Sequence, residues 1–504
     1  MKTPEFYRKL TLGILALIAS LKLLYFHFSG HSLFTEETQY WLWSKHLDWN
    51  YYSKPLMIAV YNFLSTSIFG DTELAIKLNA ILFSSMTAWV VFELTLEMYH
   101  KGKIAFWASM ILVVMPFFHL GSIFHTTDSS LYFFWILAFF FLWKALASNE
   151  MKWWVLAGFA TILGILSKNI MVLTLPTLGL YLLLTDKKRV LSKGPWVYVL
   201  VSCLSLIPIV VWNFQNDFVT FKHVGTLGGV EGEKSGFDLV QSLKYVGEYI
   251  GGQLGFLSPF FIPILWLSIK KTKFSKDPRA LFLILPTLVV WLLFLVMSIF
   301  KTVNVNWPAF AILTLPILMA YCLDSASIQW RRFALSGGIL TGVLLMLLLF
   351  PAPLDAIGFK KILRPSKDPM MRLAGYKELA TRIDHLKDSL ELRDKEFFFS
   401  DSYHVASEMA FYLKGNPQTY AINMGRRKNQ FDLWPGIGQF EQKGYYGIYL
   451  TREFEVQEAV KNGFSRIVMQ ENFPTIHRGD TVKTYIIAVL ENLRHVEEVE
   501  TGEY

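Results

Sequence analysis

Residues 281–300 read LFLILPTLVVWLLFLVMSIF, a run of twenty residues with no charged side chain. A helix of that length rises about 30 Å, which is the thickness of the hydrocarbon core of a bilayer. Runs of similar character cover Leu10 to Phe28 and Ile104 to Leu120. The chain is 53% hydrophobic and 16% aromatic over 504 residues, and its mean hydropathy is positive. These features predict an α-helical polytopic membrane protein rather than a soluble enzyme.

The apolar runs predict about eleven transmembrane helices. The first covers residues 10–30, and the last ends near residue 351. The spans are expected at about residues 10–30, 74–98, 103–121, 129–147, 153–168, 170–184, 196–213, 255–270, 281–300, 307–323 and 334–351.

Topology explains the formal net charge of +8 better than nucleic-acid binding does, because the basic residues form short clusters between apolar runs. With the N-terminus in the cytoplasm, the loops expected inside carry the basic residues, at 101–103, 152, 187–193, 270–279 and 331–332. The loops expected outside hold acids such as Glu36, Asp71 and Asp128. An odd number of spans satisfies this charge pattern. It places the C-terminal part of the chain on the extracytoplasmic side of the bacterial inner membrane.

The chain divides into two predicted domains near Pro351-Ala352-Pro353. Residues 1–351 are expected to form the transmembrane catalytic domain. Residues 352–504 are expected to form an extracytoplasmic soluble α/β domain, because short β-rich runs alternate with helical patterns there. The β-rich runs are Phe397 to Phe399, Thr419 to Ile422, Ile448 to Leu450, Arg466 to Met469 and Thr484 to Val489, and the helical patterns are Tyr376 to Leu390 and Val405 to Leu413.

The outer loop at residues 31–73 is too long for a simple connection between two spans. It is rich in aromatic residues, which are common at the membrane interface, so helices lying along the outer surface are expected here. The aromatic residues are Tyr40, Trp41, Trp43, Trp49, Tyr51 and Tyr52.

Acidic residues follow two of the predicted spans on the outer side. Glu36 and Glu37 come directly after the first span, and Asp128 opens the fourth from the same face. A carboxylate at this depth can act as a general base for an attacking acceptor or can bind a metal ion. The alternatives are a solvated helix cap for the glutamates and an N-cap for Asp128.

Basic residues near the same face could neutralise a phosphate group. Lys54 precedes Pro55, and Lys168 interrupts an otherwise apolar stretch; both could instead anchor the chain at the interface. Lys222 and His223 lie in an outer loop whose glycines, including Gly229 and Gly232, are compatible with a mobile substrate lid.

Three familiar catalytic or metal-binding patterns are missing from the sequence. The chain has no GxxxxGK[ST] phosphate loop, no HExxH pair and no CxxC site, which disfavours nucleotide hydrolysis and a thiolate metal site. Its two cysteines, Cys203 and Cys322, lie in apolar runs, so a disulfide framework is not expected.

Several motifs together resemble one family of membrane enzymes. The segment from Glu36 to Ser44 and the segment from Asp48 to Pro55 resemble the first outer loop of GT-C fold glycosyltransferases of families 39 and 83. Further matches are Thr127-Asp128, Ser167-Lys168-Asn169, Trp212-Asn213, Asn306-Trp307-Pro308, Asp401-Ser402-Tyr403, Gly425-Arg426-Arg427 and Asp432 to Gly436. This group includes protein O-mannosyltransferases and the aminoarabinose transferase that modifies lipid A.

The resemblance implies a site at the outer face. Glu36 corresponds to the loop acid near the donor phosphate and Asp128 to a second acid, so both are predicted catalytic residues. Lys54, Lys168, Lys222 and His223 are predicted to bind the donor phosphate, and Glu37, Tyr52, Asn306 and Trp307 are further candidates.

Two departures from the family pattern concern a divalent metal cation. The family usually has Asp where this chain has Glu36, and relatives with an acid before Lys-Pro contrast with Ser53. The loss of that carboxylate removes one hard oxygen ligand from a metal site that Glu36 and Asp128 could form. Whether the enzyme needs a divalent metal cation there stays open.

The sequence is therefore interpreted as that of a glycosyltransferase that moves a monosaccharide from a polyprenyl-phosphate donor to an envelope acceptor. The acceptor could be lipid A, another glycolipid or a protein, and the other expected partners are membrane lipids. The alternative is a polytopic transporter or lipid flippase, since charges near helix ends also line transport pathways.

Overall fold

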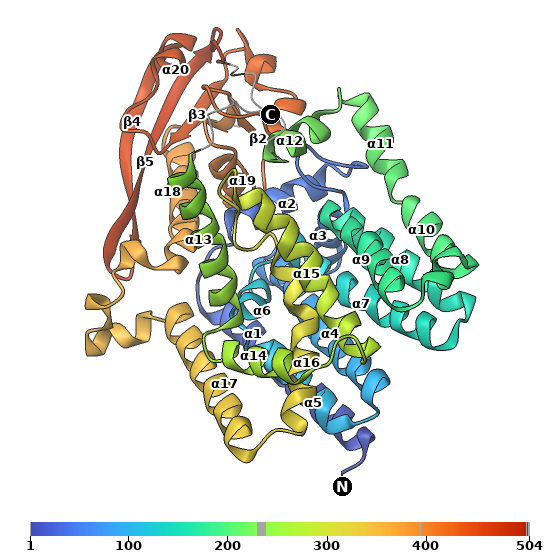
Figure 1. Ribbon diagram of the computed structural model, residues 1–504. Helices are drawn as coiled ribbons and strands as arrows, with labels where there is room; N and C mark the ends of the chain where they lie inside the picture. The colour runs from blue at the N-terminus through green and yellow to red at the C-terminus, as the bar shows by residue number, and fades with distance from the viewer. Residues whose placement is uncertain (1, 229–237, 393–394, 500, 502–504) are drawn as a thin grey trace.

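A computed structural model describes residues 2–228, 238–392, 395–499 and 501. A bundle of helices is followed by a small sheet at one end of the molecule, and the N-terminus lies at the opposite end (Figure 1). The helices of the bundle are α1 (Pro4–Phe28), α2 (Thr35–Lys45), α3 (Met57–Phe69), α4 (Glu73–Tyr99), α5 (Gly102–Val114), α6 (Pro116–Gly121), α7 (Thr127–Ser148), α8 (Met151–Ser167), α9 (Thr174–Thr185), α10 (Lys193–Cys203), α11 (Leu206–Gln215), α12 (Val219–Gly228), α13 (Leu239–Leu257), α14 (Ile262–Lys271), α15 (Pro278–Ser298), α16 (Leu315–Asp324) and α17 (Ile328–Leu349).

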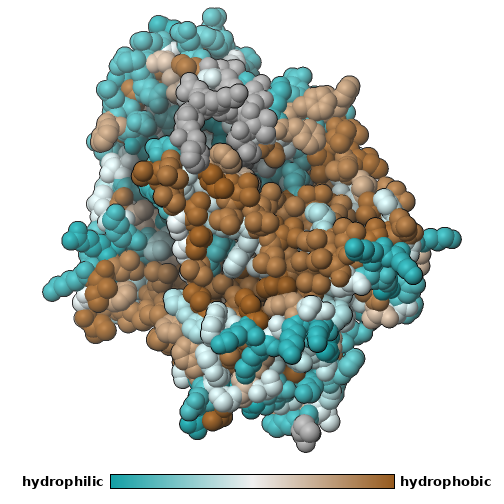
Figure 2. All heavy atoms as spheres, viewed as in Figure 1, coloured by the Kyte–Doolittle hydropathy of each residue, from teal (hydrophilic) through white to brown (hydrophobic). Residues whose placement is uncertain are grey.

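A broad apolar belt crosses the face of the bundle shown in Figure 2, with hydrophilic surface above and below it. Among the described residues, six helices are long and apolar enough to cross a membrane, and the bent pair α13 and α14 would add a seventh span. Five shorter apolar helices accompany them. The protein is thus a multi-pass membrane protein, and the number of eleven spans stays a prediction.

Several predicted spans are broken helices in the structure. The predicted span at 103–121 is divided at Met115, because Pro116 disfavours the helical conformation for the residue before it. The span at 307–323 begins as the 3₁₀ helix η3 (Ala309–Thr314) before α16. Thr287 donates to the carbonyl of Ala311 at 2.7 Å. A neighbouring helix therefore satisfies backbone groups that the break leaves without an intrahelical partner.

The span predicted at 255–270 differs from the structure. The chain already enters α13 at Leu239, where the side chain of Asp238 accepts from the backbone N–H groups of Val240 and Gln241 and caps the helix. Helix α13 ends at Ser258, which has a φ of +70°, and α14 follows at 91° to it. Of the predicted glycine-rich lid, Gly225 and Gly228 belong to α12, whereas Gly229 and Gly232 lie outside the described residues.

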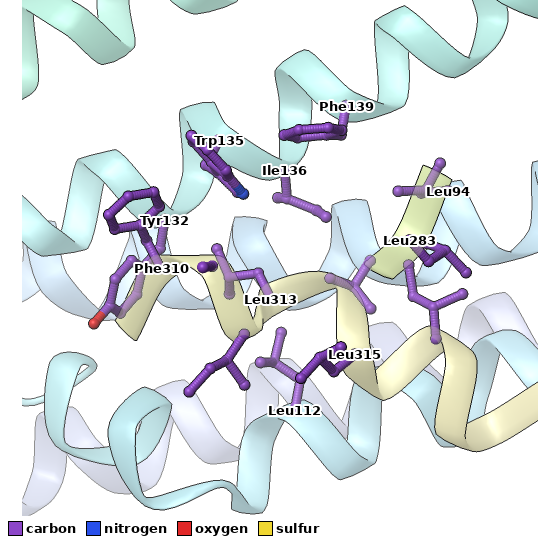
Figure 3. Close-up of a cluster of buried hydrophobic side chains, with 14 of the residues drawn as sticks. Leu94, Leu112, Tyr132, Trp135, Ile136, Phe139, Leu283, Phe310, Leu313 and Leu315 are labelled. Atoms are coloured by element: carbon purple, nitrogen blue, oxygen red, sulfur yellow. The ribbon is translucent and has the colours of Figure 1, made fainter. Parts of the chain in front are cut away.

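The core of the bundle lies where α7, α15 and α16 surround η3. Trp135 of α7 meets Phe310 of η3 edge-on, with ring centroids 4.6 Å apart, and Leu313 and Leu112 fill the space beside them (Figure 3). These side chains are buried, and their packing fixes the segment that begins at Asn306 against the start of α7.

The C-terminal part contains a five-stranded sheet, and each of the five β-rich runs found in the sequence overlaps one of its strands. The elements are α18 (Tyr376–Ser389), β1 (Glu396–Ser400), α19 (Tyr403–Tyr412), β2 (Thr419–Ala421), β3 (Tyr446–Thr451), α20 (Glu458–Gly463), β4 (Phe464–His477) and β5 (Asp480–Leu493). The strand order is β2-β1-β3-β5-β4, with β1 parallel to β2 and β3 and with antiparallel pairs at β3–β5 and β4–β5. Helices α18 and α19 pack on one face.

Helix α19 also packs against α2 and thereby joins the sheet to the outer loop. Trp41 of α2 contacts Phe411 of α19 edge-on at 4.9 Å. Most of the loop aromatics therefore pack inside the protein, and the expectation that helices of this loop lie along the outer surface stays a prediction. The buried members of that set are Tyr40, Trp41, Trp43, Tyr51 and Tyr52, whereas Trp49 is 62% exposed.

Candidate functional site

Two charged residues of neighbouring helices form an ion pair near one end of the bundle. Lys168 ends α8, and its Nζ lies 2.5 Å from Oδ1 of Asp128 in the first turn of α7. The amide of Asn306 donates to the other carboxylate oxygen of Asp128 at 3.1 Å. Asp128 does not cap its helix, because Thr126 holds that position and its hydroxyl accepts from the backbone N–H of Asp128. Its side chain is therefore available for the ion pair.

Glu36 lies beside this pair on helix α2. The hydroxyl of Tyr40, one turn later, lies 3.4 Å from the carboxylate of Glu36 and is positioned to donate to it. Burial raises the pKa of Glu36, while the positive charge of Lys54 opposes that rise and the negative charge of Asp128 adds to it. Glu36 is thus a half-buried carboxylate with an affinity for protons above that of an exposed glutamate.

Lys54 brings a second cation to the same place. Its backbone carbonyl accepts from the N–H of Tyr51 at 3.0 Å, in a turn that also pairs Asn50 with Pro55. The ammonium group makes no hydrogen bond or ion pair with any described residue. Burial lowers the pKa of Lys54, as does the charge of Lys168, while Glu36 and Asp128 act against that lowering. A partly buried cation without a partner is suited to receive an anionic ligand.

Glu37 makes different contacts from those of the adjacent Glu36. It is fully buried, and Nζ of Lys77 in α4 lies 2.5 Å from its carboxylate. The backbone N–H groups of Phe34 and His125 donate to the same carboxylate at 2.8 and 2.7 Å. Glu37 therefore holds α2 to α4 and to the loop before α7. Glu37 was a candidate from the sequence and Lys77 was not, although a lysine inside an apolar span is a signal for a buried partner.

The other predicted residues lie in two places, with Tyr52 and His223 in contact at the turn that carries Lys54 and Trp307 against α15. The rings of His223 and Tyr52 lie 4.9 Å apart, and both side chains are buried. Lys222 is the preceding residue of α12 and is partly exposed. Trp307 packs against Phe294, with ring centroids 6.2 Å apart. None of these contacts brings a second carboxylate to Glu36.

The Trp212-Asn213 motif braces the same turn. The indole N–H of Trp212 donates to Asp48 at 2.7 Å. Asn213 accepts from the backbone N–H of Thr220, and the hydroxyl of Thr220 accepts from Asn50 at 2.9 Å. The turn from 48 to 55 is therefore held by residues about 165 positions away in the chain.

A loop of the C-terminal part covers this turn and supplies residues to which the sequence analysis gave no role. Gln430 accepts from the backbone N–H of Tyr52 at 2.7 Å. Arg426 is fixed by two hydrogen bonds to Asp432, of 2.8 and 2.9 Å. Arg427 is exposed and makes no side-chain hydrogen bond or ion pair with any described residue. The charge of Arg427 contributes to the lowered pKa of Lys54.

Tyr403, at the start of α19, faces the same group of charges. Burial raises its pKa, and so does the negative charge of Glu36, whereas the charges of Arg427 and Arg426 lower it. The only sequence signal for these residues was their position in motifs, because Tyr403 and Glu36 are 367 positions apart in the chain.

The donor set does not fit a divalent cation at Glu36 and Asp128. One oxygen of Asp128 accepts from an ammonium group and the other from an amide. Within the described ranges, no group of three or more His, Cys, Asp or Glu side chains could hold a metal ion. Lys54 and Lys168 bring two positive charges to the same place.

Comparison with known proteins gives a consistent picture. Residues 53–212 match the family described as dolichyl-phosphate-mannose-protein mannosyltransferase. The chain is 25% identical over 406 residues to the lipid A galacturonosyltransferase RgtD of Rhizobium johnstonii, with 78% of this chain and 83% of the relative covered. It is 26% identical over 175 residues to an undecaprenyl phosphate-alpha-4-amino-4-deoxy-L-arabinose arabinosyl transferase of Serratia proteamaculans, which covers 33% of this chain and 31% of the relative.

The fold is similar to a solved structure, that of ArnT from Cupriavidus metallidurans bound to undecaprenyl phosphate. The TM-score is 0.65 at 15% identity, with 94% of this chain and 97% of that one covered. The likeness extends through both the helices and the C-terminal sheet, and it establishes the GT-C fold.

Proposed function

We propose that this chain, a membrane glycosyltransferase with the GT-C fold, transfers one monosaccharide from a polyprenyl phosphate to an acceptor of the bacterial envelope. The observation that carries the proposal is the convergence of Glu36, Lys54 and the Asp128–Lys168 pair. At one end of an apolar bundle, two cations can bind a lipid phosphate and a carboxylate can accept a proton.

Each charged residue has a proposed role in the reaction. The acceptor hydroxyl attacks the anomeric carbon and gives its proton to the carboxylate of Glu36. The bond between that carbon and the phosphate oxygen breaks, and polyprenyl phosphate leaves with one additional negative charge. Lys54 and Lys168 bind the phosphate and stabilise this charge as it develops. Asp128 orients Lys168 through the 2.5 Å ion pair.

We further propose that the site faces the periplasm. The site and the C-terminal sheet lie at the same end of the bundle, while the N-terminus lies at the other (Figure 1). The basic clusters at 101–103 and 331–332 support a cytoplasmic location for the N-terminal end. A lipid-linked donor in the outer leaflet would then reach the site laterally.

Sugar transfer in proteoliposomes tests this function. The donors are radiolabelled polyprenyl phosphates that carry galacturonic acid or aminoarabinose, the sugars in the names of the relatives. Lipid A is the first acceptor, followed by other glycolipids and envelope proteins. Label that moves to one acceptor supports the proposal and identifies the acceptor class. Release or movement of intact donor across the bilayer without transfer would instead support a flippase.

A parallel reaction in EDTA tests the metal prediction. We expect transfer to persist, because Lys54 and Lys168 supply positive charge and protein donors occupy both oxygens of Asp128. Loss of transfer in EDTA that a divalent cation restores would assign Glu36 and Asp128 as its ligands.

The pH dependence of kcat/KM is expected to be bell-shaped. Glu36 accepts a proton only above its pKa, which burial raises, so the acid limb lies above the value of about 4.3 for exposed glutamate. Lys54 binds phosphate only while protonated, and burial lowers its pKa, so the alkaline limb lies below about 10.4. In Lys54→Arg the guanidinium stays charged, and the alkaline limb should move upward while the acid limb stays.

Lys45→Arg is the matched control for this profile, because Lys45 pairs with Asp71 on the outer side of α2. An alkaline limb that Lys54→Arg leaves in place would show that another group controls it.

Arg427→Ala is expected to raise the KM for the donor about tenfold or more, with a smaller change in kcat. A hydrogen bond to a charged group contributes about 1.5–3 kcal/mol, and Arg427 is an unpaired cation on the loop that covers Lys54. Arg494→Ala removes an exposed arginine elsewhere and serves as the control. Donor KM values that agree between the two variants would remove Arg427 from the donor site.

A further inference from the structure

A groove of about 550 Å³ lies between α5, α16 and α17, at the end of the bundle opposite to the sheet. This volume is typical of a site for a small ligand or part of a lipid. The groove is separate from the charged site, since its lining comes from residues 103–114, 261 and 320–342. Neither the fold nor the proposed reaction gives it a role.

The glycines of α17 create this groove. Gly337 sits against Phe260, where a Cβ atom would come within 2.7 Å of that side chain. Gly342 lines the groove itself, and a Cβ atom there would meet nothing within 4 Å. Helix α17 therefore approaches the bundle closely at one turn and leaves open space at the next.

The mouth of the groove is positively charged. Lys103 begins α5, Arg332 lies in the first turns of α17, and neither side chain makes a hydrogen bond or ion pair within the described part of the chain. Arg331 donates to the carbonyls of Leu323 and Asp324 at 2.9 and 2.5 Å and is held there. The carboxylate of Asp324 is paired with Lys101 at 3.2 Å. Two unpaired cations therefore remain at the mouth.

Beyond the mouth the walls are apolar. Trp107, Ile111 and Val114 follow along α5, and Leu335 and Ile339 face them from α17. From Lys103 to Val114 the helix rises about 16 Å at 1.5 Å per residue. This is close to half of the roughly 30 Å hydrocarbon core, which is the depth of one leaflet. The charges thus lie at headgroup level while the apolar end reaches the middle of the bilayer.

We propose that this groove binds one anionic glycerophospholipid, with its phosphate at Lys103 and Arg332 and an acyl chain along α5 and α17. Basic pockets between transmembrane helices favour anionic headgroups in this way. The partly exposed ring of Trp107 lies at the level of the glycerol backbone, where tryptophan is common in membrane proteins.

Native mass spectrometry of the full chain, purified in detergent, tests this proposal. The probes are phosphatidylglycerol, phosphatidylethanolamine and undecaprenyl phosphate, each added alone. We expect phosphatidylglycerol to bind at least tenfold more tightly than phosphatidylethanolamine. Lys103→Gln combined with Arg332→Gln should remove that preference, whereas Lys187→Gln combined with Lys188→Gln, two exposed cations outside the groove, should retain it.

Gly342→Trp fills the groove and provides an independent test. It should reduce phosphatidylglycerol binding by a similar factor without lowering the unfolding temperature. Phosphatidylglycerol binding that neither the groove variant nor the charge variant changes would overturn the proposal. So would a loss of undecaprenyl phosphate binding, rather than of phosphatidylglycerol binding, in the groove and charge variants. A dimer of the wild type that Gly342→Trp dissociates would also overturn it, because Gly338 and Gly342 could then pack against a second copy.

Discussion

Glu36→Gln is expected to lower the rate of sugar transfer by a factor of roughly 10² to 10⁴, the range that a general base supplies. The glutamine side chain has the same shape and can still accept from the hydroxyl of Tyr40. It cannot take the proton of the acceptor. The defect should therefore appear in kcat, while the KM for the donor changes little because Lys54 and Lys168 remain in place.

Single-turnover transfer in proteoliposomes measures this effect apart from product release. Glu150→Gln is the control, since Glu150 pairs with Lys152 on the exposed surface beyond the end of α7. Asp128→Asn distinguishes the role of Asp128 from that of Glu36. It weakens the ion pair that holds Lys168, so it should raise the KM for the donor. A Glu36→Gln rate within threefold of wild type would mean that another group accepts the proton.

The parts of the fold that the sequence predicted correctly depend on local patterns. The strands of the C-terminal sheet follow short β-rich runs, and the long spans follow apolar runs of the length of a bilayer. The broken spans were missed because proline and glycine weaken a helix without fixing where it divides. Most of α13 was placed in the outer loop between the predicted spans 196–213 and 255–270, yet the cap at Asp238 and the packing of the helix against α15 keep the segment helical.

The candidate site was predictable where charges stand out against apolar surroundings. Glu36, Asp128, Lys54 and Lys168 were all found in this way, and the structure brings them together. The covering loop with Arg427 was noted as a motif but given no role, because its place depends on contacts such as that of Gln430 with Tyr52. The same long-range docking buries Trp41 and Trp43, which belong to an outer loop whose aromatic composition is typical of the membrane interface.

Glu37→Gln is expected to affect stability, whereas Glu36→Gln affects the rate of transfer. Glu37→Gln should destabilise the protein by about 3–5 kcal/mol, the usual result of breaking a buried ion pair. The ammonium of Lys77 would stay buried without its carboxylate. The amide also brings an N–H group to a place where Phe34 and His125 already donate, so at least one buried donor would lose its acceptor.

Unfolding temperature in detergent, measured for both single variants, shows the contrast between these adjacent glutamates. Adding Lys77→Met to Glu37→Gln should recover part of the loss, since it removes the uncompensated charge. Recovery should be incomplete, because the backbone N–H groups of Phe34 and His125 still lack a carboxylate. An unfolding temperature for Glu37→Gln equal to that of wild type would mean that the pair does not hold α2 in place. The orientation of Glu36 would then have to come from the packing of α2 against α19 alone.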